Sequence, residues 1–250
     1  MMIDAKNLHF KALNERINEA AGEQVVVRNC CGQRYIASGL SGKRLELYGT
    51  PGNALGAYLD GSTILLHGNA QEAVGDTMNA GEIYIDGMAG DATGYAMRGG
   101  SIFIHGNVGY RAGIHMKEYQ DKKPLLVVGG VAGSFLGEYQ AGGTIIVLGL
   151  HAAERVPVGN FCGTGMHGGV IYLRAESLPV DFSERLLSKK AEQADLEAIM
   201  PALRRFCSLF HEDLEAITAR NFYVIRPNTN NPYKQLYACL LYTSSNPVGS

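Results

Sequence analysis

The sequence predicts a mainly β protein, built as a parallel β-helix with one strand in each coil, an N-terminal helical cap and a C-terminal helical segment. Glycines at 49, 68, 87 and 106 recur every 19 residues, and those at 56, 75, 94 and 113 keep the same period. Each unit holds one short apolar run, such as residues 64–66, which is typical of a strand. No unit contains a helical pattern of ten residues, and a fixed period near 20 residues indicates a solenoid.

Residues 1–40 are expected to cap one end of the solenoid. A helical pattern begins at residue 4, and Leu13, Ile17 and Ala20 fall on one face of it. Gly22 is expected to end the helix. Two short apolar runs, 25–27 and 35–37, are expected to be strands that hide the open edge of the sheet.

Residues 41–175 form the repeat itself, with seven predicted strands and glycine corners. Glycine reaches positive φ without a steric penalty, and stacked corners need the same bend in every coil. The glycines with this structural role are Gly49, Gly56, Gly68, Gly75, Gly87, Gly94, Gly106, Gly113, Gly130 and Gly137. Two charged insertions, 117–123 and 151–158, are expected as surface loops.

Alternation along the strands assigns two faces to the sheet. The inward face is predicted to carry Ile64, Leu66, Ile83, Ile85, Ile102 and Ile104. The outward face carries an apolar ladder, which is a candidate interface: Leu65, Tyr84, Phe103, Leu126, Ile146 and Ile171. Because a solvated face would be polar, we expect the ladder to be covered, either by the chain's own terminal segments or by a partner protein.

Residues 176–240 are expected to be a helical and extended segment that lies over this ladder. Leu196, Ile199 and Leu203 recur at three- and four-residue steps within 183–209, and Pro201 is expected to kink that helix. A short helix near 212–219 and an extended run at 222–227 follow. Residues 241–250 are polar and unpatterned, and are expected to be disordered.

Composition argues against several classes of protein. The net charge of −2 and the lack of a basic block give no support to nucleic-acid or membrane-surface binding. No apolar run approaches the ~18 residues that span a membrane, and the N-terminus lacks the pattern of a signal peptide. The five cysteines include no CxxC pair, so neither a disulfide framework nor a metal cluster is indicated. A cytoplasmic location is expected.

One column of polar residues is a candidate metal site. His67, Asp86 and His105 each precede a column glycine, and stacked coils would place them at ~4.8 Å intervals. Imidazole and carboxylate are suitable ligands for a transition metal. The flanking residues, Tyr48 and Val128, would not extend the site, and a hydrogen-bonded polar ladder is the favoured interpretation. No nucleophile elbow, HExxH or phosphate-binding motif is present in the sequence.

Together, the repeat and the tail resemble a known family. A strand followed by a glycine, six residues and a second glycine, with a corner such as Met97-Arg98-Gly99-Gly100, is similar to the GXGXG domain of the glutamate synthase large subunit. The ending, with Phe206, Pro227 and Tyr233, resembles stand-alone forms of that domain. The resemblance covers about residues 3–237 and implies a right-handed parallel β-helix.

The resemblance also implies a function. In glutamate synthase, the β-helix domain is a scaffold, whereas the amidotransferase domain carries a catalytic N-terminal cysteine and the synthase domain holds FMN and an iron–sulfur cluster. We therefore expect a non-catalytic scaffold subunit of a glutamate synthase-like complex, which transfers the amide nitrogen of glutamine to 2-oxoglutarate or a related acceptor. The expected partners are a glutamine amidotransferase and an FMN-dependent synthase subunit. The resemblance places FMN and the cluster in a partner, and implies no cofactor and no catalytic residue in this chain.

Two alternatives stay open. The same β-helix occurs in one of the subunits of formylmethanofuran dehydrogenase, although the helical tail argues against that subunit. From a different class, the chain could be a free-standing β-helix enzyme with its site at the insertions. Self-association is compatible with each of these interpretations.

Overall fold

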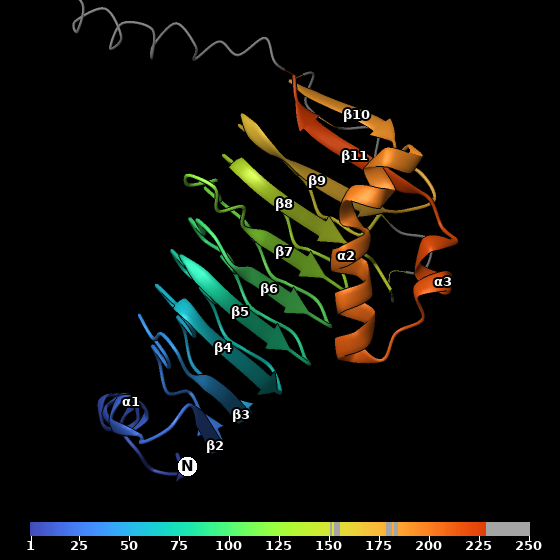
Figure 1. Ribbon diagram of the computed structural model, residues 1–250. Helices are drawn as coiled ribbons and strands as arrows, with labels where there is room; N and C mark the ends of the chain where they lie inside the picture. The colour runs from blue at the N-terminus through green and yellow to red at the C-terminus, as the bar shows by residue number, and fades with distance from the viewer. Residues whose placement is uncertain (151, 153–155, 179–181, 183–184, 229–250) are drawn as a thin grey trace, which may run out of the picture.

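The structure of the chain is a computed structural model, and it describes residues 1–150, 152, 156–178, 182 and 185–228 (Figure 1). The described residues are mainly β, as predicted, with one sheet in the order β1-β2-β3-β4-β5-β6-β7-β8-β9-β11-β10. The strands are β1 (Met2–Asp4), β2 (Gln24–Cys31), β3 (Arg44–Thr50), β4 (Asp60–His67), β5 (Ala80–Ile85), β6 (Ser101–Ile104), β7 (Leu125–Val128), β8 (Ala141–Val147), β9 (Gly168–Arg174), β10 (Leu186–Lys190) and β11 (Phe222–Pro227), and the helices are α1 (Phe10–Glu19), α2 (Gln193–Phe210) and α3 (Leu214–Thr218).

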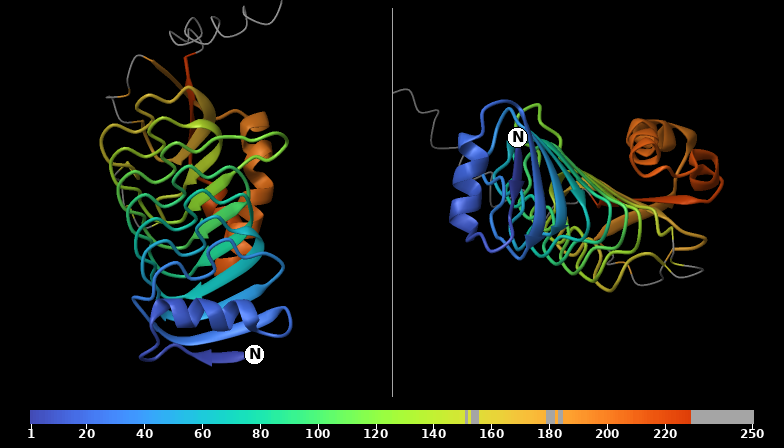
Figure 2. Two further views of the ribbon diagram at one scale, coloured as in Figure 1. Left: turned by 90° about the vertical axis from the view of Figure 1, so that its left-hand side faces the viewer. Right: turned by 90° about the horizontal axis from the view of Figure 1, so that it is seen from below.

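Strands β1 to β9 pair in parallel, each with the next along the chain. The loops that join them also stack, because the backbone N–H of Ala54 donates to Glu72 O at 2.8 Å and that of Tyr58 donates to Asp76 O at 2.7 Å. A second short ladder of parallel bridges runs from Ala89 through Val108 and Ala132 to Val158. Successive units are therefore bonded to each other at the strand, at a bridge and at a corner. The units stack one on the next along the molecule (Figure 2).

The inward prediction is confirmed at all six positions. Ile64, Leu66, Ile83, Ile85, Ile102 and Ile104 have no exposed surface and belong to one core cluster. Parallel register stacks Ile64 on Ile83 and Ile83 on Ile102. This core fills the space between the sheet and the loops on its inner side.

The glycine columns exist for two different reasons. Gly56, Gly75, Gly94, Gly113 and Gly137 all have φ between +64° and +74°, as a corner glycine is expected to. The other column is mixed: Gly49 and Gly68 have φ of 113° and 147°, whereas Gly87, Gly106 and Gly130 do not have positive φ. In these last three, each backbone N–H donates to the column glycine of the preceding coil, as in Gly106 to Gly87 at 2.9 Å, and a Cβ at Gly106 would lie 2.8 Å from Gly87 O. Close approach of neighbouring coils fixes those glycines.

At the N-terminal end, α1 packs Leu13 and Ile17 into the core, as the helical pattern predicts. The Lys43 ammonium group donates to the carbonyls of Ile17, Asn18 and Ala20 at 2.8–3.0 Å, which satisfies the last turn of the helix. Strand β2 includes the predicted run 25–27. The run 35–37 is not a strand, because Tyr35 and Ala37 have φ of 58° and 61° and form a corner of the first coil.

The C-terminal segment differs from the predicted long helix. Residues 186–190 form β10, and α2 begins at Gln193 and continues through Pro201 to Phe210. The predicted short helix and extended run are present as α3 and β11. Strand β11 pairs antiparallel with both β9 and β10, so the end of the chain closes the parallel part of the sheet. The predicted disordered residues 241–250 lie outside the described residues.

Two of the six predicted ladder positions are wrong. Leu126 pairs with Ile102 and Ile171 pairs with Ile145, so both belong to the inner core. Val127 and Tyr172 face outward in their place. The first insertion lengthens one unit to 24 residues, and two glycines, Gly129 and Gly130, follow β7. If Gly129 is taken as the column glycine in place of Gly130, every residue of β7 is assigned to the opposite face of the sheet.

Candidate functional site

The outer face of the sheet is covered by the chain itself over one half only. Helix α2 lies across the strands from β5 to β9, on the side opposite the connecting loops (Figure 2). Beneath it, the helix and the sheet form a second apolar cluster. Its buried members are Tyr84, Phe103, Val127, Ile146, Leu148, Tyr172, Ile199, Leu203, Phe206, Cys207, Ile217, Phe222 and Val224. Three of the predicted ladder residues, Tyr84, Phe103 and Ile146, are thus buried under α2, whereas Leu65 is half-buried and packs against this cluster.

Phe206 is the centre of this contact. Its side chain is fully buried and its ring lies 4.9 Å from the ring of Phe210, edge to face. A Cβ at Gly129 would lie 2.6 Å from Cζ of Phe206. Gly129 follows His105 in the stacked column, since its N–H donates to Ile104 O. The column of His67, Asp86 and His105 therefore ends at Gly129, and not at Val128, because Phe206 occupies the next position.

The three candidate metal ligands do not converge on one point. His67 Nε2 lies 3.0 Å from Glu46 Oε1, while His105 Nε2 lies 2.8 Å from Glu212 Oε1. His105 Nδ1 faces Asp86 at 3.7 Å, on the opposite side of the ring. Within the part of the chain that the structure describes, no group of three or more His, Cys, Asp and Glu side chains has the arrangement of a metal site. The column is a ladder of polar pairs.

His105 also joins the sheet to the end of α2. Its ring stacks on Phe210 with a centroid distance of 4.9 Å and an interplanar angle of 4°. Glu212, which follows the left-handed C-cap of α2 at His211, accepts from the same imidazole. One side chain of the repeat therefore fixes both the last turn of α2 and the segment that leads to α3.

A second seam joins α2 to the sheet through Arg205. The guanidinium group of Arg205 lies 5.3 Å from the centroid of Tyr84 and donates to its hydroxyl at 2.6 Å. The Tyr84 hydroxyl donates in turn to Glu82, which Arg205 also approaches at 3.4 Å. Burial, together with the hydrogen bond to Glu82, raises the pKa of Tyr84 to about 12.

The half of the face that α2 leaves open carries a polar cluster. The Tyr48 ring stacks on His67 at 4.6 Å, and the Arg28 guanidinium group lies over the Tyr48 ring, 4.4 Å from its centroid. Glu46 accepts from the Tyr48 hydroxyl at 2.6 Å and faces His67. Hydrogen bonds from Tyr48 and His67 lower the pKa of Glu46. The charged groups of this cluster interact with one another and stay accessible to solvent, as on the solvated face of a sheet.

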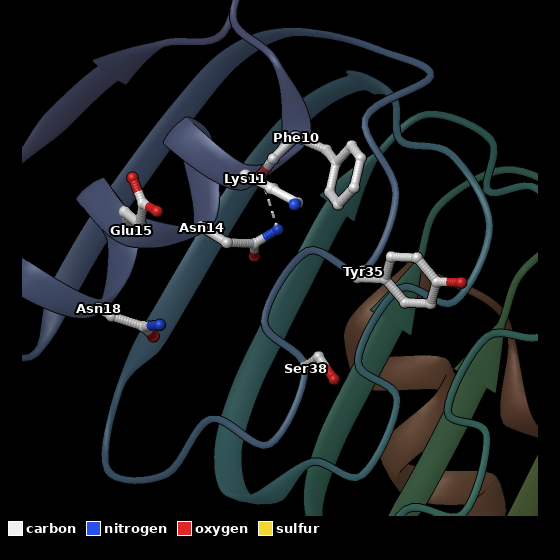
Figure 3. A pocket seen from close by; sticks show the side chains of 7 residues that line it. All are labelled: Phe10, Lys11, Asn14, Glu15, Asn18, Tyr35 and Ser38. Carbon is white, nitrogen blue, oxygen red and sulfur yellow. Dashed lines mark hydrogen bonds between the residues drawn. The ribbon is translucent and has the colours of Figure 1, made fainter.

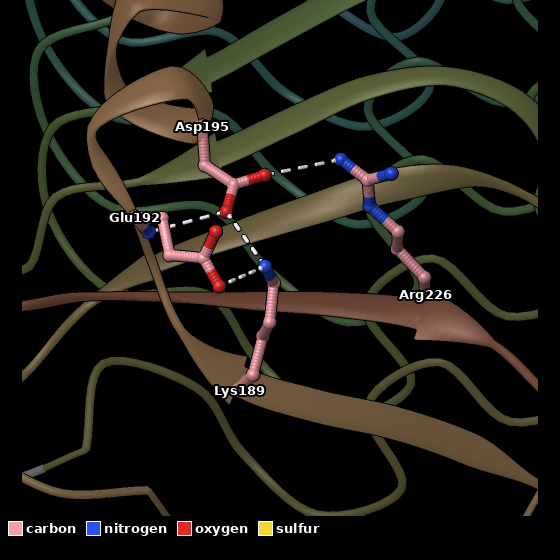
Figure 4. A network of polar contacts seen from close by, with 4 residues as sticks. All are labelled: Lys189, Glu192, Asp195 and Arg226. Atoms are coloured by element: carbon pink, nitrogen blue, oxygen red, sulfur yellow. Dashed lines mark hydrogen bonds and ion pairs between the residues drawn. The ribbon is translucent and has the colours of Figure 1, made fainter.

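The N-terminus of α2 is fixed by four charged groups (Figure 4). Lys189 of β10 lies 2.9 Å from Glu192 and 3.3 Å from Asp195, while Arg226 of β11 approaches Asp195 at 3.3 Å. The Glu192 backbone N–H donates to Asp195, which forms the reciprocal half of a capping box. Burial alone would raise the pKa of Asp195, but the hydrogen bonds from Glu192 and Lys189 outweigh it and lower the pKa. These contacts attach α2 to the last two strands.

Arg174, at the end of β9, fixes α3 in the same manner. Its guanidinium group is buried and donates to the carbonyls of Ile217, Ala216 and Leu148 at 2.9–3.2 Å. Burial lowers the pKa of Arg174. The sequence gives no pattern that identifies Arg174 or Arg205, since each acts through residues far away along the chain.

A shallow pocket of about 270 Å³ lies between α1 and the first corner (Figure 3). Phe10 and Tyr35 form its apolar side with ring centroids 6.0 Å apart, and Lys11 and Glu15 stand at its rim. Asn14 is already occupied, since its amide donates to Phe10 O and accepts from the Ala37 N–H. The volume is below the ~300–1,000 Å³ of common ligand sites, so the geometry does not single out a ligand.

Three of the cysteines are buried, which disfavours their reactive thiolate form. Burial raises the pKa of the Cys30 thiol to about 11 and that of Cys162 to about 12. Cys207 is buried under α2 and its pKa is also raised by burial. In the first insertion, 117–123, an antiparallel bridge joins Tyr119 and Lys122. In the second insertion, 151–158, residues 151 and 153–155 lie outside the described residues. None of the described helices is both long and apolar enough to cross a membrane.

Two comparisons place the chain among known proteins. The GXGXG motif family matches residues 14–228, which include the repeat as well as α2, α3 and β11. The chain is also similar to a protein described as "Uncharacterized protein MJ1350" from Methanocaldococcus jannaschii. The two are 44% identical over 250 residues, and the match covers 95% of this chain and 96% of its relative.

Proposed function

Because this chain belongs to the GXGXG motif family, whose domain is found in the large subunit of glutamate synthase, we propose that it is the non-catalytic scaffold subunit of a glutamate synthase-like complex. The complex would combine glutamine, 2-oxoglutarate or a related acceptor, two electrons and two protons. With 2-oxoglutarate, the amide nitrogen moves to the keto carbon and two molecules of glutamate result. In this proposal the chain positions the partners and takes no part in bond making.

The finer assignment of the fold belongs to the same proposal. We infer that the stacked coils are a right-handed parallel β-helix with one long strand per coil. Nine strands pair in parallel in chain order, and the intervening loops bond to their neighbours. Parallel strands joined by a crossover in one sheet are right-handed in about 98% of cases, which supports that hand.

The observation that carries the scaffold role is how the polar side chains between the sheet and its covering helices are used. His105, Arg205, Asp195 and Arg174 each connect the repeat or its closing strands to α2 or α3. Their hydrogen-bonding capacity is committed to the fold. A rigid repeat whose polar side chains are used for its own assembly is suited to positioning other domains.

The proposed partners are a glutamine amidotransferase and an FMN-dependent synthase subunit. FMN and the iron–sulfur cluster would belong to the synthase, and the complex would act in the cytoplasm. The buried cysteines of this chain fit that division, since raised thiol pKa values disfavour the thiolate that a cluster needs.

The test is reconstitution from purified components. The chain, the amidotransferase and the synthase subunit of the same genome are mixed, and the mass of the product is measured by size-exclusion chromatography with light scattering. Glutamate formation from glutamine and 2-oxoglutarate, with a chemical reductant as electron donor, is then measured with and without the chain. We expect a complex that contains all three proteins, and glutamate formation that depends on it.

Three results would contradict the proposal. Full activity without the chain would remove the scaffold role. A flavin absorbance band or turnover by the isolated chain would favour the free-standing enzyme. Assembly with molybdopterin-enzyme subunits, and not with the synthase, would favour the formylmethanofuran dehydrogenase alternative.

A further inference from the structure

Every corner of the repeat has the same unusual backbone. Three alternate residues adopt the left-handed conformation, as in Ala54, Gly56 and Tyr58. The residue between the first and second of these positions points inward; here it is Leu55, which is fully buried. The left-handed conformation favours glycine, because other residues are strained in it. The backbone conformation alone therefore does not explain a bulky side chain at these positions.

The corners of the C-terminal coils carry bulky residues at these positions. The first position is held by Tyr35 in the first coil and by alanine, at 54, 73 and 92, in the next three coils. In the later coils it is held by Arg111, Phe135 and Phe161, with φ of 57°, 64° and 61°. The third position is held by His115 and Tyr139 in two of these coils, with φ of 55° and 54°. Strain of this kind is typical of positions retained for function.

Together with the exposed Tyr95 and Tyr110, which are next to corner positions in the sequence, these side chains form a surface here called the aromatic corner: Tyr95, Tyr110, Arg111, His115, Phe135, Tyr139 and Phe161. Phe135 stacks on Phe161 at 5.0 Å, and His115 stacks on Tyr139 at 5.2 Å. The Arg111 guanidinium group continues the first stack, 5.3 Å from the Phe135 ring. Phe161 is 62% exposed and Tyr139 is 46% exposed. The rings do not serve the core.

The surface is rigid and nearly uncharged. The backbone N–H groups of Arg111, Phe135 and Tyr139 donate to the next coil at 2.8–2.9 Å. Arg111, the cation of the surface, is paired with the buried carboxylate of Glu138 at 3.1 Å. The connecting loops that carry the aromatic corner lie on the side of the sheet away from α2 (Figure 2). A fixed backbone lowers the entropy that is lost when such a surface binds.

We propose that the aromatic corner is the contact surface between two copies of this chain. In a two-fold interface each residue faces its own symmetry mate or a near neighbour, so that unpaired charges of one sign would repel. The neutralised Arg111 avoids that repulsion, and stacked rings are self-complementary. At 39–62% exposure, Tyr95, Tyr110, Tyr139 and Phe161 display roughly 400 Å² of ring surface, about half of the ~800 Å² that each partner contributes to a standard interface. The inference does not depend on the proposed glutamate synthase-like complex.

The test uses glycine substitutions, because glycine suits the left-handed backbone and keeps the fold. A variant of the full chain with Phe135→Gly, Tyr139→Gly and Phe161→Gly is compared with wild type in sedimentation equilibrium over a concentration series. Tyr58→Gly is the matched control, since Tyr58 is 55% exposed and left-handed but lies outside the aromatic corner. We expect wild type and the control to weigh twice 26.9 kDa, and the triple variant to dimerise at least about 100-fold more weakly.

Thermal unfolding of the three proteins at low concentration verifies that each is folded. A wild-type chain that stays monomeric at about 100 µM would overturn the inference. A dimer that is unaffected by the triple substitution, or equally weakened by Tyr58→Gly, would overturn it as well. So would a monomer that uses the aromatic corner to bind the synthase subunit, since the occupant would then be another protein.

Discussion

The outer face of the sheet has two halves that share one inner core but differ in what covers them. Over β5 to β9, the outward positions are Tyr84, Phe103, Val127, Ile146 and Tyr172, all buried by α2 or the closing strands. Over β2 to β4, the equivalent positions are Val26, Glu46 and Leu65, none of which is fully buried. The inward positions of both halves are equally apolar and buried. The inward positions are apolar in every coil of the repeat. The outward positions differ between the halves: they are apolar where α2 or the closing strands cover them and more polar where the sheet is open.

The largest expected effect comes from removing the centre of the covered half. Phe206→Ala leaves a cavity between α2, Gly129 and the His105 ring, and is expected to lower the free energy of unfolding by about 3–5 kcal/mol. Urea denaturation followed by circular dichroism measures the change.

Leu65→Ala is the matched substitution in the open half. Leu65 is only half-buried, so the same measurement is expected to show a loss of about 1 kcal/mol or less. Equal losses at the two positions would mean that α2 does not distinguish the halves.

The second effect is the part of the alkaline pH dependence that Tyr84 contributes in the covered half, beside the buried thiols of Cys30 and Cys162. The folded pKa of Tyr84 is raised to about 12, above the unfolded value near 10, so the stabilisation is fully present below pH 10 and is lost as the pH rises towards 12. The full loss is about 2.7 kcal/mol by that difference in pKa, of which about 2 kcal/mol is expected by pH 11.5. Denaturation profiles at pH 9 and pH 11.5 measure it, and Tyr84→Phe should remove this part of the pH dependence.

Tyr48 in the open half provides the control. Its pKa is also raised by the hydrogen bond to Glu46, but its hydroxyl is accessible to solvent. Tyr48→Phe is expected to leave the alkaline profile nearly unchanged. A profile that depends on Tyr48 and not on Tyr84 would contradict the assignment of the titration to the covered half.

A smaller effect separates the two histidines of the polar column. His105→Ala removes the stack on Phe210 and the contact with Glu212, and is expected to cost about 1 kcal/mol. His67→Ala removes an accessible pair with Glu46 and is expected to cost about 0.5 kcal/mol. Thermal unfolding of both variants compares them, and hydrogen exchange of α2 should speed up for His105→Ala alone. Faster exchange of α2 in His67→Ala would contradict the division.

The smallest effect concerns the corners, which both halves share. Ala54→Gly and Ala92→Gly relieve left-handed strain while adding unfolded-state entropy, so each should change stability by about 0.5 kcal/mol or less. Ala112→Gly, at a buried corner position without positive φ, should cost about 1 kcal/mol. A difference between Ala54→Gly and Ala92→Gly beyond the error would show that α2 influences the corners.

The sequence predicts the features that recur with the period of the repeat. The glycine columns and the stack of Ile64, Ile83 and Ile102 follow from a fixed step of 19 residues, because parallel register places equivalent residues beside each other. Leu126 and Ile171 could not be placed by that rule. The first follows a longer unit, and the last unit has no closing glycine after Leu173 to set the count.

Contacts between segments far apart in the sequence could not be predicted from the repeat period. The apolar ladder and the amphipathic helix are both visible in the sequence, and their packing agrees with the expectation that the tail covers the ladder. The polar contacts that fix the helix are not visible, since Arg205 reaches Tyr84 across 121 positions and Glu212 reaches His105 across 107. The pairing of β10 and β11 also gave no signal, because residues 186–190 are charged and helix-prone.

The proposed role as a scaffold is tested most directly by purifying this chain from its own cells under native conditions and identifying its stoichiometric partners by mass spectrometry. We expect a glutamine amidotransferase and an FMN-dependent synthase subunit, in a fixed ratio to the chain. Recovery of molybdopterin-enzyme subunits in their place, or of the chain with no other protein at all, would contradict that role.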